Sequence, residues 1–145
     1  MVEPPDDSTR AVFIPNTGAT LGRYTLGDRL GIGGMGEVWL AKDTSLNREA
    51  ALKFLSPRFS ADESFRTRFI REARAAAALN HPNVITIYEV GEHEGQAFIA
   101  MEFVKGCPLD AFTVKGPLKQ DILLDIMIQI RSEEHTSELQ SRQVI

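Results

Sequence analysis

The feature that most constrains the fold is a glycine cluster between two strand-like stretches. Residues 31–36 read GIGGMG, with glycines spaced as G-x-G-x-x-G. Residues 24–30 and 37–42, on either side, read as β-strands. In dinucleotide-binding turns this motif leads into a helix, so that the pyrophosphate meets the helix N-terminus. Here a strand follows. The cluster is therefore predicted to join two antiparallel strands, either as a plain hairpin turn or as a loop over a ligand.

The remaining strand patterns predict one sheet. Residues 49–55 form a third predicted strand. Residues 84–90 and 96–104 form two more, joined by a tight turn over residues 91–95. Because short hairpins connect these strands, the sheet should be largely antiparallel.

Residues 60–80 carry the pattern of a helix. Ser60 and Glu63 have the spacing of a capping box, and the alanines at 75–78 favour a helix. Glu72 shares a stripe with the apolar residues, so its carboxylate should face inward and need a partner. The alternative is a plain solvent-facing charge. The apolar residues of this stripe are Phe65, Phe69, Ala76 and Leu79.

Composition excludes several classes of protein. The 145 residues suffice for one domain, and the net charge of −4 argues against a nucleic-acid-binding surface. The single cysteine, Cys107, excludes a disulfide framework and a cysteine-based metal site. No apolar run approaches the roughly 18 residues of a membrane span. Residues 1–22 begin with an acidic, proline-rich stretch, and are predicted to be a flexible leader rather than a signal peptide.

Three motifs occur in order along the chain. Residues 31–38 fit G-x-G-x-x-G-x-V, residues 50–53 fit the strand motif V-A-I-K, and Glu72 fits the charged partner on the next helix. With these motifs the chain resembles the N-terminal lobe of eukaryotic-like protein kinases, above all the bacterial serine/threonine kinases. The stretches GGMGEV (33–38), RFIREA (68–73), LNHPN (79–83) and MEFV (101–104) share this resemblance.

The resemblance covers about residues 23–130 and implies an α+β fold. The expected N-lobe has a five-stranded antiparallel sheet covered by one helix. The start of a helical C-terminal lobe would follow, with its first long helix at about residues 118–130.

The family resemblance also implies an ATP site. Glycines let backbone N–H groups approach the phosphates, and Lys53 would contact the α- and β-phosphates. Glu72 would hold Lys53 by an ion pair. Val38 and Ala51 would enclose the adenine, which the backbone of residues 102–104 would hydrogen-bond. The ATP-binding residues implied are Leu30, Gly31, Ile32, Gly33, Gly34, Met35, Gly36, Glu37, Val38, Ala51, Lys53, Met101 (the gatekeeper), Glu102 and Val104.

Phosphoryl transfer in this family needs more than these residues. It also uses H-R-D-x-x-x-x-N and D-F-G motifs, the second of which holds Mg²⁺. Neither motif occurs in the 145 residues. The magnesium ligands are thus expected outside this chain, which is expected to be inactive alone. Two hypotheses remain for the parent protein: a serine/threonine kinase with unidentified protein substrates, or a pseudokinase that binds nucleotide or partners. Its kinase domain would be cytoplasmic, and a membrane anchor elsewhere in the parent is left open.

Residues 131–145 do not continue the apolar helical pattern. The string RSEEHTSELQS (131–141) resembles the in-frame translation of a widely used DNA-sequencing adapter. Residues 131–145 are therefore expected to be non-biological. The competing interpretation is a genuine polar helix.

Overall fold

The structure is a computed structural model that describes residues 12–109, 111, 116 and 119–142, with the side chains described as far as residue 131. It divides into two compact units. The first comprises Met1–Ala76 and Ile87–Phe103, and the second comprises Ala77–Thr86 and Val104–Ile145. Each unit is described by itself.

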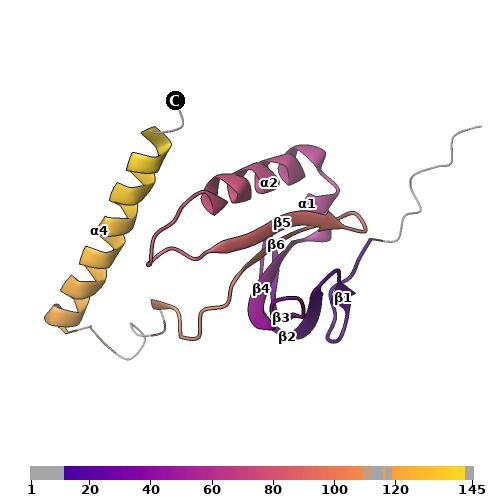
Figure 1. Ribbon diagram of the computed structural model, residues 1–145, viewed down its shortest axis with the longest axis horizontal. Helices are drawn as coiled ribbons and strands as arrows, with labels where there is room; N and C mark the ends of the chain where they lie inside the picture. The colour runs from indigo at the N-terminus through magenta and orange to yellow at the C-terminus, as the bar shows by residue number, and fades with distance from the viewer. Residues whose placement is uncertain (1–11, 110, 112–115, 117–118, 143–145) are drawn as a thin grey trace, which may run out of the picture. The chain divides into compact units, whose positions relative to one another are not determined.

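An antiparallel sheet forms the first unit (Figure 1). In the described residues it has six strands, in the order β1-β2-β3-β4-β6-β5. All five predicted strands are present, together with a short additional one. The strands are β1 (Thr20–Leu21), β2 (Tyr24–Gly33), β3 (Gly36–Asp43), β4 (Arg48–Leu55), β5 (Ile87–His93) and β6 (Gln96–Glu102). Two helices, α1 (Pro57–Ser60) and α2 (Glu63–Ala77), lie between β4 and β5 in the chain.

The two faces of the sheet carry separate apolar clusters, because successive side chains of a strand point to opposite faces. Leu52 and Phe54 of β4 belong to the first cluster, and Leu55 belongs to the second. Helix α2 covers the second face through Phe69 and Ala73, as expected for the predicted covering helix. The first cluster consists of Leu21, Tyr24, Leu26, Trp39, Ala41, Ala50, Leu52, Phe54, Phe98 and Ala100.

The predicted leader needs a correction in its second half. Leu21 is buried within β1, and the ring of Phe13 lies 5.9 Å from that of Phe54. The Phe13 N–H also donates to the Glu94 carbonyl at 3.2 Å. Leu21, Phe13 and Ala19 add to the first cluster, which is why this part of the segment packs on the sheet. Residues 1–11 lie outside the described part of the chain.

The predicted capping box is wrong. Ser60 ends the short helix α1, and its hydroxyl donates to the carbonyl of Leu55 at 3.3 Å. Asp62 serves α2 instead, accepting the N–H of Phe65 at 3.2 Å. A proline suits the first turn of a helix, so Pro57 starts α1 early and places Ser60 at its end. Helix α2 then stops at Ala77, short of the predicted residue 80.

The β5–β6 hairpin is tighter than predicted. Its turn uses two residues, Glu94 and Gly95, with φ angles of 46° and 76°. Positive φ at both central residues is the geometry of a type I′ turn, whose twist matches the flanking strands. β5 therefore runs on to His93, through most of the predicted 91–95 turn, and β6 ends at Glu102 rather than at residue 104.

Helix α4 (Gln120–Arg142) belongs to the second unit. The predicted start at residue 118 lies outside the described residues. The helix continues beyond residue 130 without a break, so the backbone does not mark the start of the polar tail. Among the described residues, none of the helices combines the length and apolar character needed to cross a bilayer.

Candidate functional site

The strand register brings four predicted site residues onto one face of the sheet. Val38 of β3 lies opposite Lys53 of β4, and Ala51 of β4 lies opposite Met101 of β6. Ala51 and Lys53 are two residues apart and thus share a face. Since directly opposed side chains in an antiparallel pair lie on the same face, all four do. This is the face covered by α2, because Met101 packs against its apolar cluster.

The glycine cluster forms the hairpin between β2 and β3, as predicted. Gly33 pairs with Gly36, and Gly34 and Met35 make the turn. A Cβ atom built on Gly31 or Gly34 would meet no atom within 4 Å. The backbone of this hairpin is thus open to approach by a ligand. Hairpin residues Leu30, Ile32 and Met35 are all exposed.

Glu37 has a local partner. Its carboxylate lies 3.7 Å from the guanidinium of Arg29 on the facing strand. Cross-strand pairs of opposite charge stabilise antiparallel sheets modestly. In this structure Glu37 therefore ties the two strands of the glycine hairpin together.

Lys53 and Glu72 are not brought together. Lys53 is half-buried, whereas Glu72 is exposed on α2. None of the ion pairs found in the described part of the chain joins them. Ala73 faces the sheet, and Glu72 sits about 100° round the helix from it. The inward-facing prediction for Glu72 is thus wrong in this structure, and the solvent-facing alternative describes it.

The predicted hinge spans the two units. Glu102 ends β6 in the first unit, opposite Ala50 of β4. Val104 belongs to the second unit and is exposed. Glu102 and Phe103 therefore belong to the unit that contains the sheet, and Val104 does not.

The described residues show no preformed cluster of metal-ligating side chains. They contain no group of three or more His, Cys, Asp or Glu side chains placed to hold a metal ion. Mg²⁺ requires oxygen ligands in near-ideal octahedral geometry.

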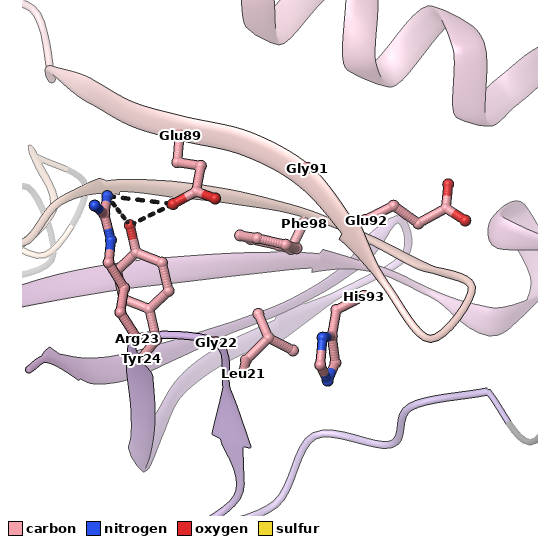
Figure 2. A pocket seen from close by; sticks show the side chains of 9 residues that line it. All are labelled: Leu21, Gly22, Arg23, Tyr24, Glu89, Gly91, Glu92, His93 and Phe98. Atoms are coloured by element: carbon pink, nitrogen blue, oxygen red, sulfur yellow. Dashed lines mark hydrogen bonds and ion pairs between the residues drawn. The ribbon is translucent and has the colours of Figure 1, made fainter.

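A cavity of about 330 Å³ lies on the opposite face of the sheet (Figure 2). Sequence analysis selected none of its residues. Arg23 donates to the Tyr24 hydroxyl at 2.8 Å, and that hydroxyl donates to Glu89 at 3.0 Å. Arg23 also pairs with Glu89 at 3.2 Å. Burial is the main cause of the raised pKa of Tyr24, so the hydroxyl stays protonated as a donor. Arg23, Tyr24 and Glu89 thus form a linked polar group at this cavity, although the Nε atom of Arg23 has no hydrogen-bond partner within the described part of the chain.

Comparison with known proteins extends these observations. Residues 24–133 match the family model described as the protein kinase domain. The chain is 44% identical over 112 residues to the serine/threonine-protein kinase PrkC of Bacillus subtilis. It is 46% identical over 110 residues to the serine/threonine-protein kinase PknB of Mycobacterium leprae. These matches cover 77% and 72% of this chain but only 17% and 18% of the two relatives.

A solved structure shows the same fold. The crystal structure of the PknI kinase domain of Mycobacterium tuberculosis aligns with a TM-score of 0.77 and 32% identity. The alignment covers 88% of this chain and 52% of that one. The described sheet with its covering helix is thus a kinase N-lobe fold, as the resemblance implied. With the family match over residues 24–133, these findings show that the chain belongs to the protein kinase family.

Proposed function

We propose that this chain is the ATP-binding part of a serine/threonine protein kinase. The observation that carries the proposal is the placement of Val38, Ala51, Lys53 and Met101 on one sheet face, next to an open glycine hairpin. The similarity to PrkC and PknB, both named serine/threonine-protein kinases, supports it. The domain proposed for this role is residues 23–130.

The phosphates are the part of ATP for which this arrangement is best suited. The backbone at Gly31, Gly33 and Gly34 can approach anionic oxygens because no side chain is in the way there. Lys53 supplies a compact positive charge beside them. The half-buried position of Lys53 limits solvent screening of that charge.

The adenine would lie against the apolar part of the same face. Val38 and Ala51 offer small surfaces to a flat ring, and Met101 would stand behind it. The backbone of residues 102–104 would hydrogen-bond its polar edge. The remaining hairpin residues Leu30, Ile32, Met35 and Glu37 would form the loop over the nucleotide.

Transfer of the γ-phosphoryl group to a protein hydroxyl is proposed for the complete protein only. The catalytic motifs are absent from these 145 residues, so the chain alone is proposed to bind nucleotide without turnover. A Lys53–Glu72 ion pair is proposed for the active state. Since Glu72 is exposed here, forming that pair requires α2 to move or rotate.

Binding of a fluorescent ATP analogue tests the proposal. Lys53→Ala should weaken binding at least tenfold, because one desolvated charge on phosphate is lost. Lys42→Ala is the matched control: Lys42 is exposed on the adjacent strand. Equal affinity in the wild-type and Lys53→Ala chains would overturn the role of Lys53. Absence of binding in the wild type would overturn the ATP site.

A second test addresses the parent protein. A long sequencing read of the source locus across the codon for Ile130 should continue into H-R-D and D-F-G segments. Continuation without the catalytic Asp would instead make the parent a pseudokinase. We also propose that residues 131–145 are adapter-derived. A read that reproduces residues 131–145 would contradict this second proposal.

A further inference from the structure

We infer that a hydrogen bond from the backbone N–H of Ser56 to the carbonyl of Met35 acts as a latch: it holds the tip of the glycine hairpin in place and slows the release of bound nucleotide. This inference rests on the proposed ATP site. Its central observation is a hydrogen bond: the Ser56 N–H donates to the carbonyl of Met35 at 2.8 Å. Met35 is at the turn of the hairpin, and Ser56 directly follows β4. The bond therefore joins the loop tip to the end of the strand that carries Lys53.

Gly36 shows how closely the hairpin approaches β4. It pairs with Leu55, and a Cβ atom at Gly36 would lie 1.9 Å from the carbonyl oxygen of Phe54. Such a distance is far inside van der Waals contact, so only glycine permits the approach. The absence of a side chain at Gly36 is thus what lets the Ser56–Met35 bond form.

The hairpin is held along this edge while its glycines remain accessible. A Cβ atom on Gly34 would meet nothing within 4 Å, and one on Gly33 would come no closer than 4.0 Å to another atom. The latch therefore fixes the tip without filling the space beside the glycines. A loop already ordered before binding loses less conformational entropy on binding, and such preorganisation acts mainly on the dissociation rate.

Ser56 also connects the hairpin to α1. While its N–H is bonded to Met35, its carbonyl accepts the N–H groups of Phe59 and Ser60 at 3.0 and 2.9 Å. One residue thus bonds both the loop tip and the first turn after β4. A change in the position of α1 would be transmitted to the glycine hairpin through this residue.

Ser56→Pro removes the proposed donor and places its ring Cδ where the N–H pointed, so the carbonyl of Met35 must move away. Ser56 has φ −62° and ψ 152°, which proline adopts without strain. Leu55 before it is in a strand, as the residue before a proline prefers. The carbonyl of residue 56 is kept. Ser56→Ala is the matched control, because it retains the N–H and the hydroxyl makes no capping bond.

The readout is the dissociation rate of the fluorescent ATP analogue from the 145-residue chain. We expect Ser56→Pro to release it about fivefold faster, the effect of losing one backbone hydrogen bond, and Ser56→Ala to match the wild type. An unchanged rate in Ser56→Pro would overturn the latch alone. A wild-type chain that fails to bind the analogue would overturn the proposed function. It would also overturn the effect of the latch on nucleotide release.

Hydrogen exchange in the wild-type chain keeps the latch testable if Ser56→Pro does not fold. If the Ser56–Met35 hydrogen bond strengthens nucleotide binding, then bound nucleotide must stabilise that hydrogen bond by the same factor. Saturating nucleotide should therefore slow hydrogen exchange of the Ser56 amide about fivefold. Without nucleotide, that amide should already exchange more slowly than the amide of Gly34 in the exposed turn. Exchange of the Ser56 amide as fast as that of Gly34 would overturn the latch whether or not nucleotide binds.

Discussion

The buried carboxylate of Asp43 holds two arginines where β3 ends and β4 begins. Its side chain is fully buried, and its oxygen Oδ2 lies 3.3 Å from Arg48 and 3.6 Å from Arg23. The other oxygen accepts the N–H groups of Ser45 and Leu46 at 3.1 and 3.2 Å. Asp43→Asn should therefore lower the melting temperature at pH 7, since the amide keeps an acceptor for the turn but loses the negative charge. Asp28→Asn, at an exposed position, is the control.

The stability that Asp43 contributes to the folded chain should also depend on pH. Burial alone would raise its pKa, but the N–H of Leu46 and the charges of Arg48 and Arg23 outweigh that effect and lower the pKa. A lowered folded-state pKa contributes stability above the unfolded value of about 3.9. That contribution is lost as the pH falls through the folded pKa. The difference in melting temperature between the wild type and Asp43→Asn should thus shrink below about pH 4. A gap that stays constant to pH 2 would contradict this assignment.

Lys53 and Glu72 show how far the sequence pattern could predict the direction in which a side chain points. Lys53 shares a sheet face with Ala51, because side chains two residues apart on a strand point the same way. Glu72 does not face the sheet, although its spacing placed it on the apolar stripe. The residues of α2 that pack on the sheet are Phe65, Phe69, Ile70 and Ala73, so the buried stripe passes to one side of Glu72. Spacing alone therefore could not determine whether Glu72 faces the sheet.

At the scale of elements, Gln96 joins the end of β4, the end of α1 and the start of β6. It is 2% exposed, and its amide donates to the carbonyl of Leu55, to the Ser60 hydroxyl and to the carbonyl of Ala97. Gln96→Leu should lower the free energy of unfolding by about 2 kcal/mol, since buried acceptors are left without their donor. Urea unfolding measures this loss.

A double-mutant cycle separates this contact from general disruption. Ser60→Ala should cost about 1 kcal/mol, because Gln96 keeps its two carbonyl acceptors. Combined with Gln96→Leu, the Ser60→Ala change should add less than it costs alone, since the bond between the two side chains is already gone. Strict additivity of the two losses would show that they act independently.

The start of α2 gives a second test at this scale. Asp62→Ala should lower the free energy of unfolding by about 1 kcal/mol, the usual cost of removing a helix cap. Ser64→Ala, at an exposed position in the first turn, should have little effect. The sequence could not settle the cap, because Ser60 and Asp62 both precede the helical pattern. The outcome depended on Pro57, which begins a separate short helix. A neutral Asp62→Ala would contradict the cap.

For the whole molecule, five strands followed from alternation, and the antiparallel pairing of neighbours followed from short connections, which are local properties. The pairing of β4 with β6 did not, because it joins residues 50–54 to residues 98–102. The two-residue strand β1 did not, because two residues carry no detectable period. Its presence depends on long-range packing, as Leu21 and Phe13 fill space on the first face of the sheet. Sequence patterns therefore predicted the frame of the N-lobe, whereas the segment that completes its core depended on tertiary contacts.

The exposed apolar residues of helix α4 lead to a prediction about self-association of the whole chain. Its first half exposes large apolar residues on successive positions, and a helix that is apolar all round is normally buried. We expect the 145-residue chain to self-associate with rising concentration, because burying this surface is favourable. The residues concerned are Ile122, Leu123, Leu124, Met127, Ile128 and Ile130.

The double variant Leu124→Gln/Ile128→Gln tests this expectation. These side chains are 57% and 59% exposed, so they can be changed without opening a cavity in a core. Sedimentation velocity should show a shift from oligomers toward monomer, and fluorescence of a hydrophobic dye should fall. Lys119→Gln, just before the helix, is the control and should leave both measurements unchanged. A wild-type chain that stays monomeric at high concentration would show that the apolar surface of α4 is covered within the same molecule, and would contradict its exposure in the structure.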